Sequence, residues 1–326
     1  MARLAGVSVA TVSYVINGTV TVTPETRRVV QAAIRELDYH PNSQARGLAK
    51  AATRTIGLAI ARNRYTSDPF LMEFVAGMGD VTVGAGYGLL LAPFADGGEL
   101  MLVKERRVDG LVLLDTDVDD PRLPQLQELK FPVVIFGRAD NARGFPWIDV
   151  DGYAGGRMVA EHLLRLGHRR IAHVAAPQHF MYARERQRGW ADRLTEAGLP
   201  PELVAEGDLT EASGERALLE LLALPEPPTA VFVASDLMAA GLIKAAHSQG
   251  VRVPEDLAVV GFDDTRMAEW LSPPLTTVQQ PILDLGRQAA QMLLDRLEGR
   301  SRQPRGVLIS PRLVVRRSCG AAADPT

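Results

Sequence analysis

The sequence predicts a small all-α unit followed by an α/β core that is built from two doubly wound parallel-sheet lobes. Before residue 55 the apolar residues recur at helical spacing, whereas from Thr55 onward short apolar runs alternate with longer amphipathic segments. That alternation is typical of parallel α/β folds, in which helices cover the sheet. The length of the core and a break rich in proline and glycine near residues 140–146 favour two lobes over one.

Two helices are expected in the amino-terminal unit. Ser8 can cap a helix that follows a left-handed turn at Gly6 and runs to about Ile16. Thr23 and Pro24 form a second start signal, with threonine at the cap and proline at the first helical position. The apolar faces of the two helices are predicted to consist of Val9, Val12 and Ile16 in the first and Val30, Ala33, Ile34 and Leu37 in the second.

The core alternates between predicted strands and predicted helices. Strands are expected at TIGLAIA, YGLLLAP, VDGLVLLD, VVIFG, IDV, RIAHVAA, AVFVA and LAVVGF. Helices are expected at residues 70–85, 154–166, 183–197, 236–249 and 282–298. Ligands of such folds bind beyond the carboxyl ends of the strands, so a cleft between two lobes is the natural place for a small molecule.

The composition indicates a cytoplasmic protein. The first residues, MARLAGVSVA, lack the apolar core of a secretory signal, and the single Cys319 cannot form an intrachain disulfide. No apolar run approaches the roughly 20 residues that a membrane-spanning helix needs. We therefore expect no membrane partner.

Charge is distributed unevenly along the chain. The formal net charge is −3, but residues 1–55 hold seven basic and three acidic side chains, so this segment carries +4 and the remainder −7. A basic head on an acidic body indicates a polyanion-binding module joined to a part that binds a different partner. On charge alone, chance unevenness of a solvated surface stays an open alternative.

The exposed positions of the first helix carry short side chains. In AGVSVATVSYVING they are mostly small or bear hydroxyl groups. A helix in the major groove of DNA benefits from short side chains, which allow close approach, and from hydroxyls that reach phosphates or base edges. This pattern predicts a helix-turn-helix, although a capped helical hairpin without a role in DNA binding explains it equally well.

At this point a family resemblance becomes visible. AGVSVATVSYVING and VTPETRRVVQAAIRELDYHPNSQARGLA resemble the DNA-binding headpiece and hinge of the LacI/GalR family of bacterial transcription regulators. The core resembles the same family, in the same order, at GLVLLD, DVDGYAGGRMVAEHLLRLGHRRIAHVA, RERQRGW, PTAVFVASDLMAAG, VPEDLAVVGFDDT and PPLTTVQQPILDLG. The resemblance implies a homodimeric regulator, most often a repressor, which binds a near-palindromic operator in double-stranded DNA. A small-molecule effector between the lobes would control operator affinity.

The family's organisation implies boundaries in this chain. A helix-turn-helix headpiece is expected at residues 1–41 and a hinge helix with its linker at 42–54. The N-terminal lobe is expected at 55–151 and 280–309, the C-terminal lobe at 152–279 and 310–320, and a disordered tail at 321–326. Family members have a complete helix before the one that Ser8 caps, whereas here only MARLA precedes Gly6. We therefore expect a headpiece that is truncated at its amino-terminus.

The resemblance also implies which residues contact DNA. Base-facing positions in the first helix are Val9, Ala10 and Tyr14, and phosphate contacts or caps are Ser8, Thr11, Ser13 and Asn17. Ordinary helix surface is the alternative for all of them. In the hinge the implied contacts are Asn42, Ala45, Leu48 and Ala49. Leu48 would insert into the minor groove and kink the duplex, with a core leucine as the alternative.

The effector site is carried over in the same way. Arg186 matches the family's ligand-binding arginine and Asp263 an acidic ligand contact, while Asp151, Ser235 and the adjacent Asp236 fall at similar pocket positions. Flat apolar walls are expected from Phe70, Trp147 and Tyr182. Asp236 as a helix cap is the alternative; Trp190 is expected in the core and Asp264 in a loop.

A carbohydrate is the expected effector, because the presumed cleft combines aromatic walls with several carboxylates. Enzyme activity finds no support: VGAGYG does not complete a dinucleotide fingerprint, no serine lies in a nucleophile elbow, and the six histidines form no metal-ligand pattern. Neither a cofactor nor a metal is expected. The alternative function is a sugar-binding protein of the transport class, which would need a signal peptide and no basic head.

Overall fold

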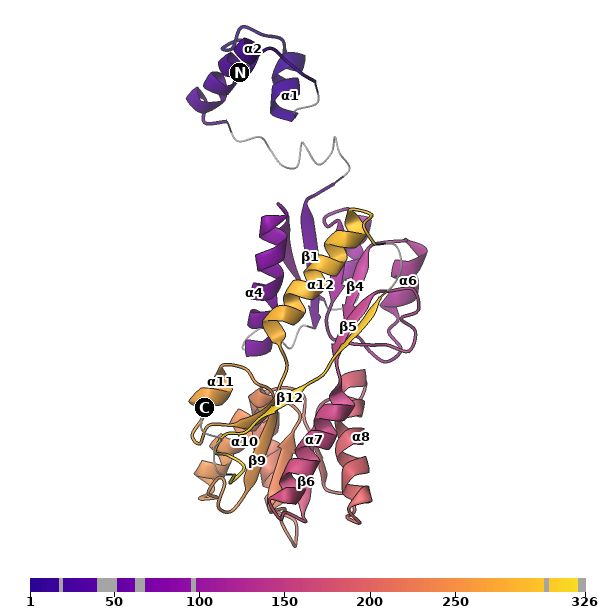
Figure 1. The fold of residues 1–326 in the computed structure, drawn as a ribbon, viewed down its shortest axis with the longest axis vertical. Helices are drawn as coiled ribbons and strands as arrows, with labels where there is room; N and C mark the ends of the chain where they lie inside the picture. The colour runs from indigo at the N-terminus through magenta and orange to yellow at the C-terminus, as the bar shows by residue number, and fades with distance from the viewer. Residues whose placement is uncertain (18–19, 40–51, 62–67, 95–97, 302–304, 322–326) are drawn as a thin grey trace. The chain divides into compact units, whose positions relative to one another are not determined.

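The computed structural model describes residues 1–17, 20–39, 52–61, 68–94, 98–301 and 305–321 (Figure 1). The chain divides into two compact units, Met1–Arg54 and Thr55–Thr326. Most of the predicted hinge and nearly all of the predicted tail lie outside the described residues, and so do the hinge contacts Asn42, Ala45, Leu48 and Ala49. In the part that the structure describes, no helix has both the length and the hydropathy to span a bilayer.

The amino-terminal unit contains the two expected helices, α1 (Val9–Asn17) and α2 (Pro24–Glu36). The side chain of Ser8 accepts a hydrogen bond from the backbone N–H of Thr11 at 3.0 Å. Thr23 caps α2 in the same way, through the N–H of Thr26 at 3.2 Å. The start signals that the sequence contained are therefore the ones that the helices use.

The apolar faces of α1 and α2 were predicted only in part. Val12, Val30 and Ala33 are buried, but Val9 is 77% exposed and Leu37 is 49% exposed. A unit of two short helices has a small interior, so only the central stripe of each apolar face is covered. The exposure of Val9 leaves it accessible to a partner.

The core holds two six-stranded sheets, which confirms the predicted α/β class. The first sheet has the order β11-β5-β4-β3-β1-β2 and the second the order β12-β10-β9-β8-β6-β7. Neighbouring strands are parallel except β12, which pairs with β10 in the antiparallel sense. We call the first sheet with its helices the N-terminal lobe and the second the C-terminal lobe.

The N-terminal lobe is assembled from both ends of the core. Its strands are β1 (Thr55–Ala61), β2 (Gly88–Phe94), β3 (Gly110–Leu113), β4 (Val133–Phe136), β5 (Trp147–Val150) and β11 (Gly306–Ile309). Its helices are α4 (Pro69–Gly84), α5 (Gly98–Lys104), α6 (Arg122–Glu128) and α12 (Ile282–Leu297). The side chains of α4 and α12 pack against one face of the sheet and those of α5 and α6 against the other.

The C-terminal lobe repeats this plan. Its strands are β6 (Ile171–Ala175), β7 (Val204–Glu206), β8 (Ala230–Val233), β9 (Ala258–Asp263), β10 (Thr276–Gln279) and β12 (Arg312–Val314). Its helices are α7 (Gly152–Arg165), α8 (Met181–Glu196), α9 (Glu211–Leu222), α10 (Asp236–Ser248) and α11 (Met267–Trp270). The α7–α8 pair covers one face of the sheet and the α9–α10 pair the other.

Helix α8 is held against α7 by direct backbone contact. A Cβ atom on Gly156 would lie 2.1 Å from the carbonyl oxygen of Arg186, and one on Gly189 would lie 2.1 Å from that of Tyr153. Both positions therefore require glycine if the helices are to keep this separation. The contact sets the separation between α7 and α8.

The chain passes between the lobes after β5, after β10 and between β11 and β12 (Figure 1). Asp149 lies on β5 just before the first passage, and Gln280 lies in the second. Polar side chains are thus placed where the carboxyl ends of strands from both sheets converge.

Candidate functional site

A cavity lies between the two lobes and encloses about 530 Å³, counting the space that is open to solvent. Five of the predicted effector residues line it: Phe70, Tyr182, Arg186, Ser235 and Asp263. Its other lining residues are Asp115, Thr116, Phe136, Gly137, Arg138, Asp149, Met181, Leu209 and Gln280.

Arg186 is held in the cavity wall by a hydrogen bond and two aromatic rings. Its side chain extends from α8, and Nη1 donates to the backbone carbonyl of Ala234 at 2.7 Å. The guanidinium carbon lies 3.6 Å from the centre of the Phe262 ring and 4.8 Å from that of Tyr182. Two aromatic faces and one carbonyl therefore orient a rigid donor fork toward the cavity.

Asp263 is fixed at the end of β9. Its backbone has φ of 128°, a conformation that side-chain-bearing residues rarely adopt, and its Oδ1 accepts a hydrogen bond from Gln280 Nε2 at 2.6 Å. The same Gln280 donates its backbone N–H to the Asp263 carbonyl at 3.1 Å. The side chain of Ser235, the third predicted polar residue, caps α10 by accepting the Met238 N–H.

Asp236 does not line the cavity, in contrast to its prediction as an effector contact. It is fully buried behind Ser235 and accepts hydrogen bonds from the N–H of Thr265 at 2.8 Å and the hydroxyl of Thr277 at 2.6 Å. Burial and the charge of Asp263 raise the pKa of Asp236 well above its usual range. Its carboxyl group ties α10 to the loop after β9 and to β10.

Trp147 and Asp151 also lie outside the cavity lining. Trp147 occupies the first position of β5, at the end of the strand remote from the carboxyl edge, where its ring packs against the backbone of Gly306. Asp151 caps α7 by accepting the N–H of Ala154 at 2.9 Å. Trp147 thus packs against the neighbouring strand β11, and Asp151 stabilises the start of α7. Trp190 is fully buried, as expected.

Three charged residues of the N-terminal wall were not predicted from the sequence: Asp115, Arg138 and Asp149. Nε of Arg138 donates to Oδ2 of Asp149 at 2.8 Å, and Nη2 donates to Oε2 of Glu185 on α8. A signal was present, because Arg138 follows directly after the apolar strand segment VVIFG, at a carboxyl end. The polar effector residues that the resemblance implied belong, apart from Asp151, to the C-terminal lobe.

Burial disfavours the charged form of both members of this pair, but it decides the net pKa shift of only one of them. Burial disfavours the charge of Arg138, but its hydrogen bond to Asp149 and the charges of Asp149 and Glu185 outweigh that effect and raise its pKa. For Asp149 burial dominates and raises the pKa, although the bond to Arg138 and the more distant charge of Arg186 oppose it. The cavity wall is therefore electrostatically linked across the lobes.

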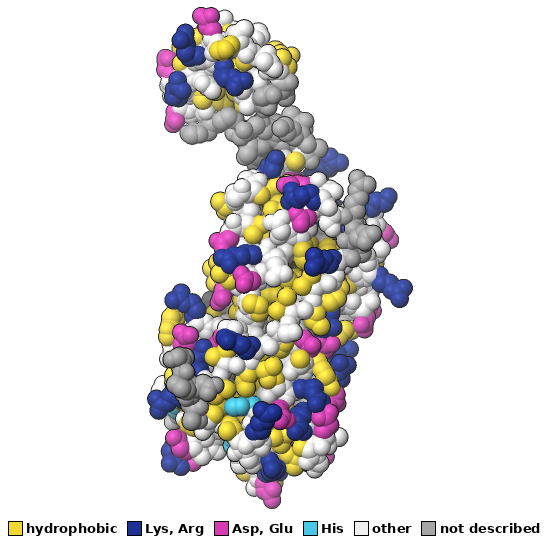
Figure 2. Space-filling view, viewed as in Figure 1, with side chains coloured by type: hydrophobic (Ala, Val, Ile, Leu, Met, Phe, Trp, Pro, Cys, Tyr) yellow, Lys and Arg dark blue, Asp and Glu magenta, His cyan; other side chains and the backbone are white. Residues whose placement is uncertain are grey.

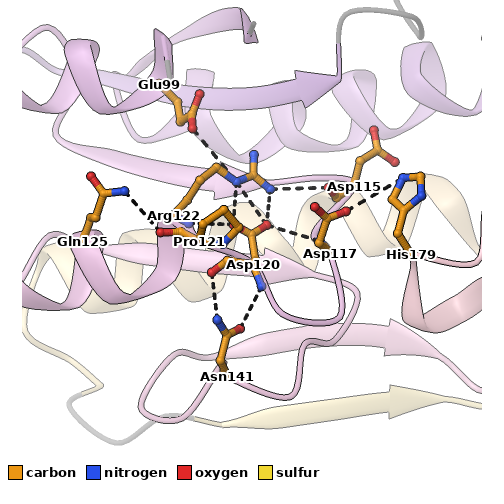
Figure 3. A network of polar contacts seen from close by, with 9 residues as sticks. All are labelled: Glu99, Asp115, Asp117, Asp120, Pro121, Arg122, Gln125, Asn141 and His179. Atoms are coloured by element: carbon orange, nitrogen blue, oxygen red, sulfur yellow. Dashed lines mark hydrogen bonds and ion pairs between the residues drawn. The ribbon is translucent and has the colours of Figure 1, made fainter. Parts of the chain in front are cut away.

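The loop at residues 115–121 forms another part of the N-terminal wall (Figure 3). In Figure 3, the Arg122 side chain lies between Glu99 and Asp120, and it donates from Nε to Oδ1 of Asp120 at 2.8 Å. Asn141 donates to the carbonyl of Asp120 at 2.8 Å. These bonds fix the Asp120 end of the loop. Asp115, at its other end, lines the cavity.

The same loop contacts the C-terminal lobe. The N–H of Val118 donates to the carbonyl of His179 at 2.8 Å, and Asp117 pairs with Phe180 in an isolated antiparallel bridge. The Asp117 carboxylate lies 3.8 Å from Nε2 of His179 (Figure 3). The lobes are thus joined by backbone contacts beside the cavity.

The predicted DNA-contacting residues of α1 are largely at its surface. Val9, Ala10, Ser13 and Tyr14 are exposed, the last by 41%, while Thr11 is half-buried and bonds to the capping Ser8. Nothing is described of the Asn17 side chain. Arg27, Arg28 and Arg35 on α2 are exposed as well, and Figure 2 shows basic side chains on this unit.

Comparison with known proteins assigns both parts of the chain. Residues 1–42 match the model of bacterial regulatory proteins of the lacI family, and residues 160–319 match that of the periplasmic binding protein-like domain. The transcriptional regulator CelR of Thermobifida fusca is 39% identical over 98% of this chain and 96% of its own length. The chain belongs to the LacI family of bacterial regulatory proteins.

Other LacI-family members are similar over the same span. The transcriptional repressor PurR of Escherichia coli O139:H28 is 35% identical over 98% of this chain and 95% of its own length. The structure of a CelR–cellobiose complex has a TM-score of 0.77 at 38% identity, and covers 97% of this chain and 98% of that one. A lac repressor dimer bound to operator and an anti-inducer has a TM-score of 0.86 at 31% identity, with 98% of both chains covered.

This LacI-family protein is therefore a DNA-binding transcriptional regulator and not an enzyme. The transport-class alternative is excluded, because the regulator headpiece is present and the full-length relatives are regulators. The interlobe cavity is the candidate effector site.

Proposed function

We propose that the protein is a homodimeric repressor whose operator affinity is set by a neutral carbohydrate bound between the lobes. The observation that carries the proposal is the convergence of rigid donors, acceptors and aromatic rings on one cavity. Arg186 and Arg138 supply donors, whereas Asp263 supplies an acceptor. The proposal also places the protein in the cytoplasm, together with the DNA that it binds.

Sugar hydroxyl groups both donate and accept, so a sugar is best held by side chains of both kinds. A guanidinium fork can donate to two neighbouring hydroxyls, and a carboxylate can accept from two. The aromatic rings of Phe70, Phe136 and Tyr182 line the same space and suit the apolar faces of a pyranose ring. The similarity to a regulator solved with cellobiose supports the same class.

The balance of charge favours a neutral sugar over a phosphorylated one. Three carboxylates line the cavity, those of Asp115, Asp149 and Asp263, against the guanidinium groups of Arg138 and Arg186. Arg138 is already paired with two carboxylates. An anionic effector would therefore enter a cavity without an excess of positive charge, which is unfavourable.

The DNA-binding half of the proposal rests on α1. Val9, Ala10 and Tyr14 are exposed on a helix of the matched headpiece, and we assign them to base contacts in the major groove. Ser8, Thr11, Ser13 and Asn17 are assigned to phosphate contacts or the helix cap. The hinge contacts assigned by resemblance remain part of the proposal. The dimer bound to operator among the similar structures supports a twofold arrangement.

Control of operator affinity would follow from a shift in population. An effector that binds one arrangement of the lobes more tightly than another favours that arrangement, and with it one spacing of the paired headpieces. Coupling energies of this kind are about 1–3 kcal/mol, so operator affinity changes by one to two orders of magnitude.

Isothermal titration with cellobiose, maltose, glucose and glucose 6-phosphate tests the effector class. We expect at least one neutral sugar to bind and glucose 6-phosphate to bind far more weakly or not at all. Tight binding of the phosphorylated sugar, or a failure of every neutral saccharide in a wider panel, would contradict the assignment.

Operator binding is tested by fluorescence anisotropy on duplexes that the protein enriches from random DNA. The enriched site should be near-palindromic, and affinity should fall steeply with salt because each neutralised phosphate releases counterions. Tyr14→Ala should weaken binding to the enriched site, whereas Tyr39→Ala, outside α1, is the control. A salt-independent affinity or an asymmetric single site would contradict the proposal.

A further inference from the structure

Arg138 joins the two lobes beside the cavity. It follows β4 in the N-terminal lobe and bonds through Nε to Asp149 of the same lobe at 2.8 Å. Its Nη2 bonds to Glu185, which lies on α8 in the C-terminal lobe. All three side chains are largely buried: 24% of Arg138, 5% of Asp149 and 12% of Glu185 is exposed. One guanidinium fork thus spans the boundary between the lobes.

The two bonds differ in what they depend on. The bond to Asp149 lies within one lobe and survives any change in lobe arrangement. The bond to Glu185 exists only while the lobes keep the arrangement seen here. Separating the lobes would break this charge-assisted hydrogen bond, so the bond favours the arrangement seen here.

Glu185 occupies a junction on α8. The following residue, Arg186, lines the cavity, whereas Glu185 itself does not. A few residues earlier, the carbonyl of His179 accepts the N–H of Val118 from the other lobe. The beginning of α8 and the segment before it therefore combine effector-site residues with interlobe contacts.

We propose that Arg138 is a positioning residue that couples occupancy of the cavity to the lobe arrangement of this structure through Glu185. The coupling to an effector rests on the proposed function, whereas the interlobe role does not. Arg138 lines the cavity, so a ligand that accepts from its guanidinium favours the orientation that also reaches Glu185. Ligand binding and this lobe arrangement then promote each other.

The interlobe role is tested in the ligand-free full-length protein by hydrogen exchange at the Val118 amide, which bonds across the lobes. In Glu185→Ala this amide should exchange roughly tenfold faster than in the parent protein, as loss of a charge-assisted bond predicts. Glu196→Ala is the matched control: Glu196 lies on the same helix and pairs with Arg157, but within one lobe. Its Val118 exchange should stay unchanged.

The outcomes separate cleanly. Unchanged exchange at Val118 in Glu185→Ala, or an equal increase in both variants, overturns the interlobe role. Glu185→Gln, which preserves the shape, should give an intermediate increase and serves if the alanine variant does not fold.

Cellobiose titration tests the coupling. Affinity should fall roughly tenfold in Glu185→Ala although Glu185 does not line the cavity. If exchange rises but sugar affinity does not change, the coupling is wrong. If the parent protein binds no sugar at all, the proposed effector class fails, while the exchange result still decides the interlobe role.

Discussion

The two walls of the cavity are held in different ways. On the C-terminal wall, Arg186 bonds to Ala234 and stacks on Phe262, and both partners belong to the same lobe. On the N-terminal wall, Arg138 bonds to Asp149 in its own lobe and to Glu185 in the other. One wall is thus organised in advance of binding, and the other depends on how the lobes meet. A regulatory site needs both kinds of wall. A wall held within one lobe, here called the fixed wall, provides binding affinity, and a wall that bonds to both lobes links binding to the lobe arrangement.

The largest expected effect tests how the fixed wall is supported. Gly189→Ala places a Cβ 2.1 Å from the carbonyl oxygen of Tyr153, so α7 and α8 must separate. We expect the free energy of unfolding to fall by roughly 3 kcal/mol in urea titrations. Gly79→Ala is the control, since a Cβ there meets nothing within 4 Å and the helix gains stability. Equal effects of the two changes would show that α8 is not held by close backbone contact.

An intermediate effect is expected at the acceptor of the fixed wall. Asp263→Asn removes the charge that lines the cavity and should weaken cellobiose binding roughly tenfold in calorimetry. Asp264→Asn is the matched control, because the neighbouring Asp264 pairs with Arg316 and does not line the cavity. Equal losses in the two variants would mean that the loop, rather than the Asp263 carboxylate, determines affinity.

The interior behind the fixed wall predicts a dependence on pH. His173 is fully buried, its Nδ1–H donates to the carbonyl of Phe232, and burial lowers its pKa to about 3. Its folded-state pKa lies below the unfolded value of about 6.5, so the unfolded state binds the extra proton as the pH falls from about 6.5 to 3. Between these pH values, His173 should lower the free energy of unfolding by about 1.4 kcal/mol for each unit by which the pH falls.

The variant His173→Gln isolates this contribution. The difference in unfolding free energy between parent and variant should change with pH only below about pH 6.5. The change should be at most about 1.4 kcal/mol per pH unit, which corresponds to one proton. Measurement by urea unfolding between pH 4 and 8 provides the check. A pH-independent difference would show that His173 is not held neutral by the core.

The smallest effect on binding is expected where the sequence misassigned a residue. Asp151→Ala removes the cap of α7 and should lower stability by about 1 kcal/mol. Cellobiose affinity should stay within twofold, because Asp151 bonds to Ala154 and does not line the cavity. A tenfold loss of affinity without a change in stability would restore Asp151 to the effector site.

The sequence predicted the fold class, because strand-length apolar runs and capped amphipathic helices are local signals. Arg186 and Asp263 were also predicted to share one site, because the motifs that contain them resemble the family's ligand-binding motifs, and both line the cavity. Asp236 does not line the cavity although Ser235 does, because one step along the chain changes the direction of a side chain. Trp147 does not line it because it lies at the amino end of β5, far from the carboxyl ends of the strands. Asp149, two residues after Trp147 on β5, lines the cavity instead.

Arg138 shows what local patterns cannot supply. Its role depends on Glu185, which is 47 residues away and in the other lobe. Only the arrangement of the two lobes brings these side chains together. The basic amino-terminal segment, by contrast, could be predicted from composition, because net charge does not depend on which residues are in contact.

The central claim is that the cavity controls the headpiece, and one comparison tests it directly. Operator affinity is measured by fluorescence anisotropy, with and without saturating cellobiose or whichever neutral sugar binds, for the parent protein and for Arg186→Ala. We expect operator affinity to change by one to two orders of magnitude in the parent, and to be the same with and without sugar in a variant that still binds the operator. A parent protein that binds the sugar without any change in operator affinity, or a variant that keeps the full response, would contradict it.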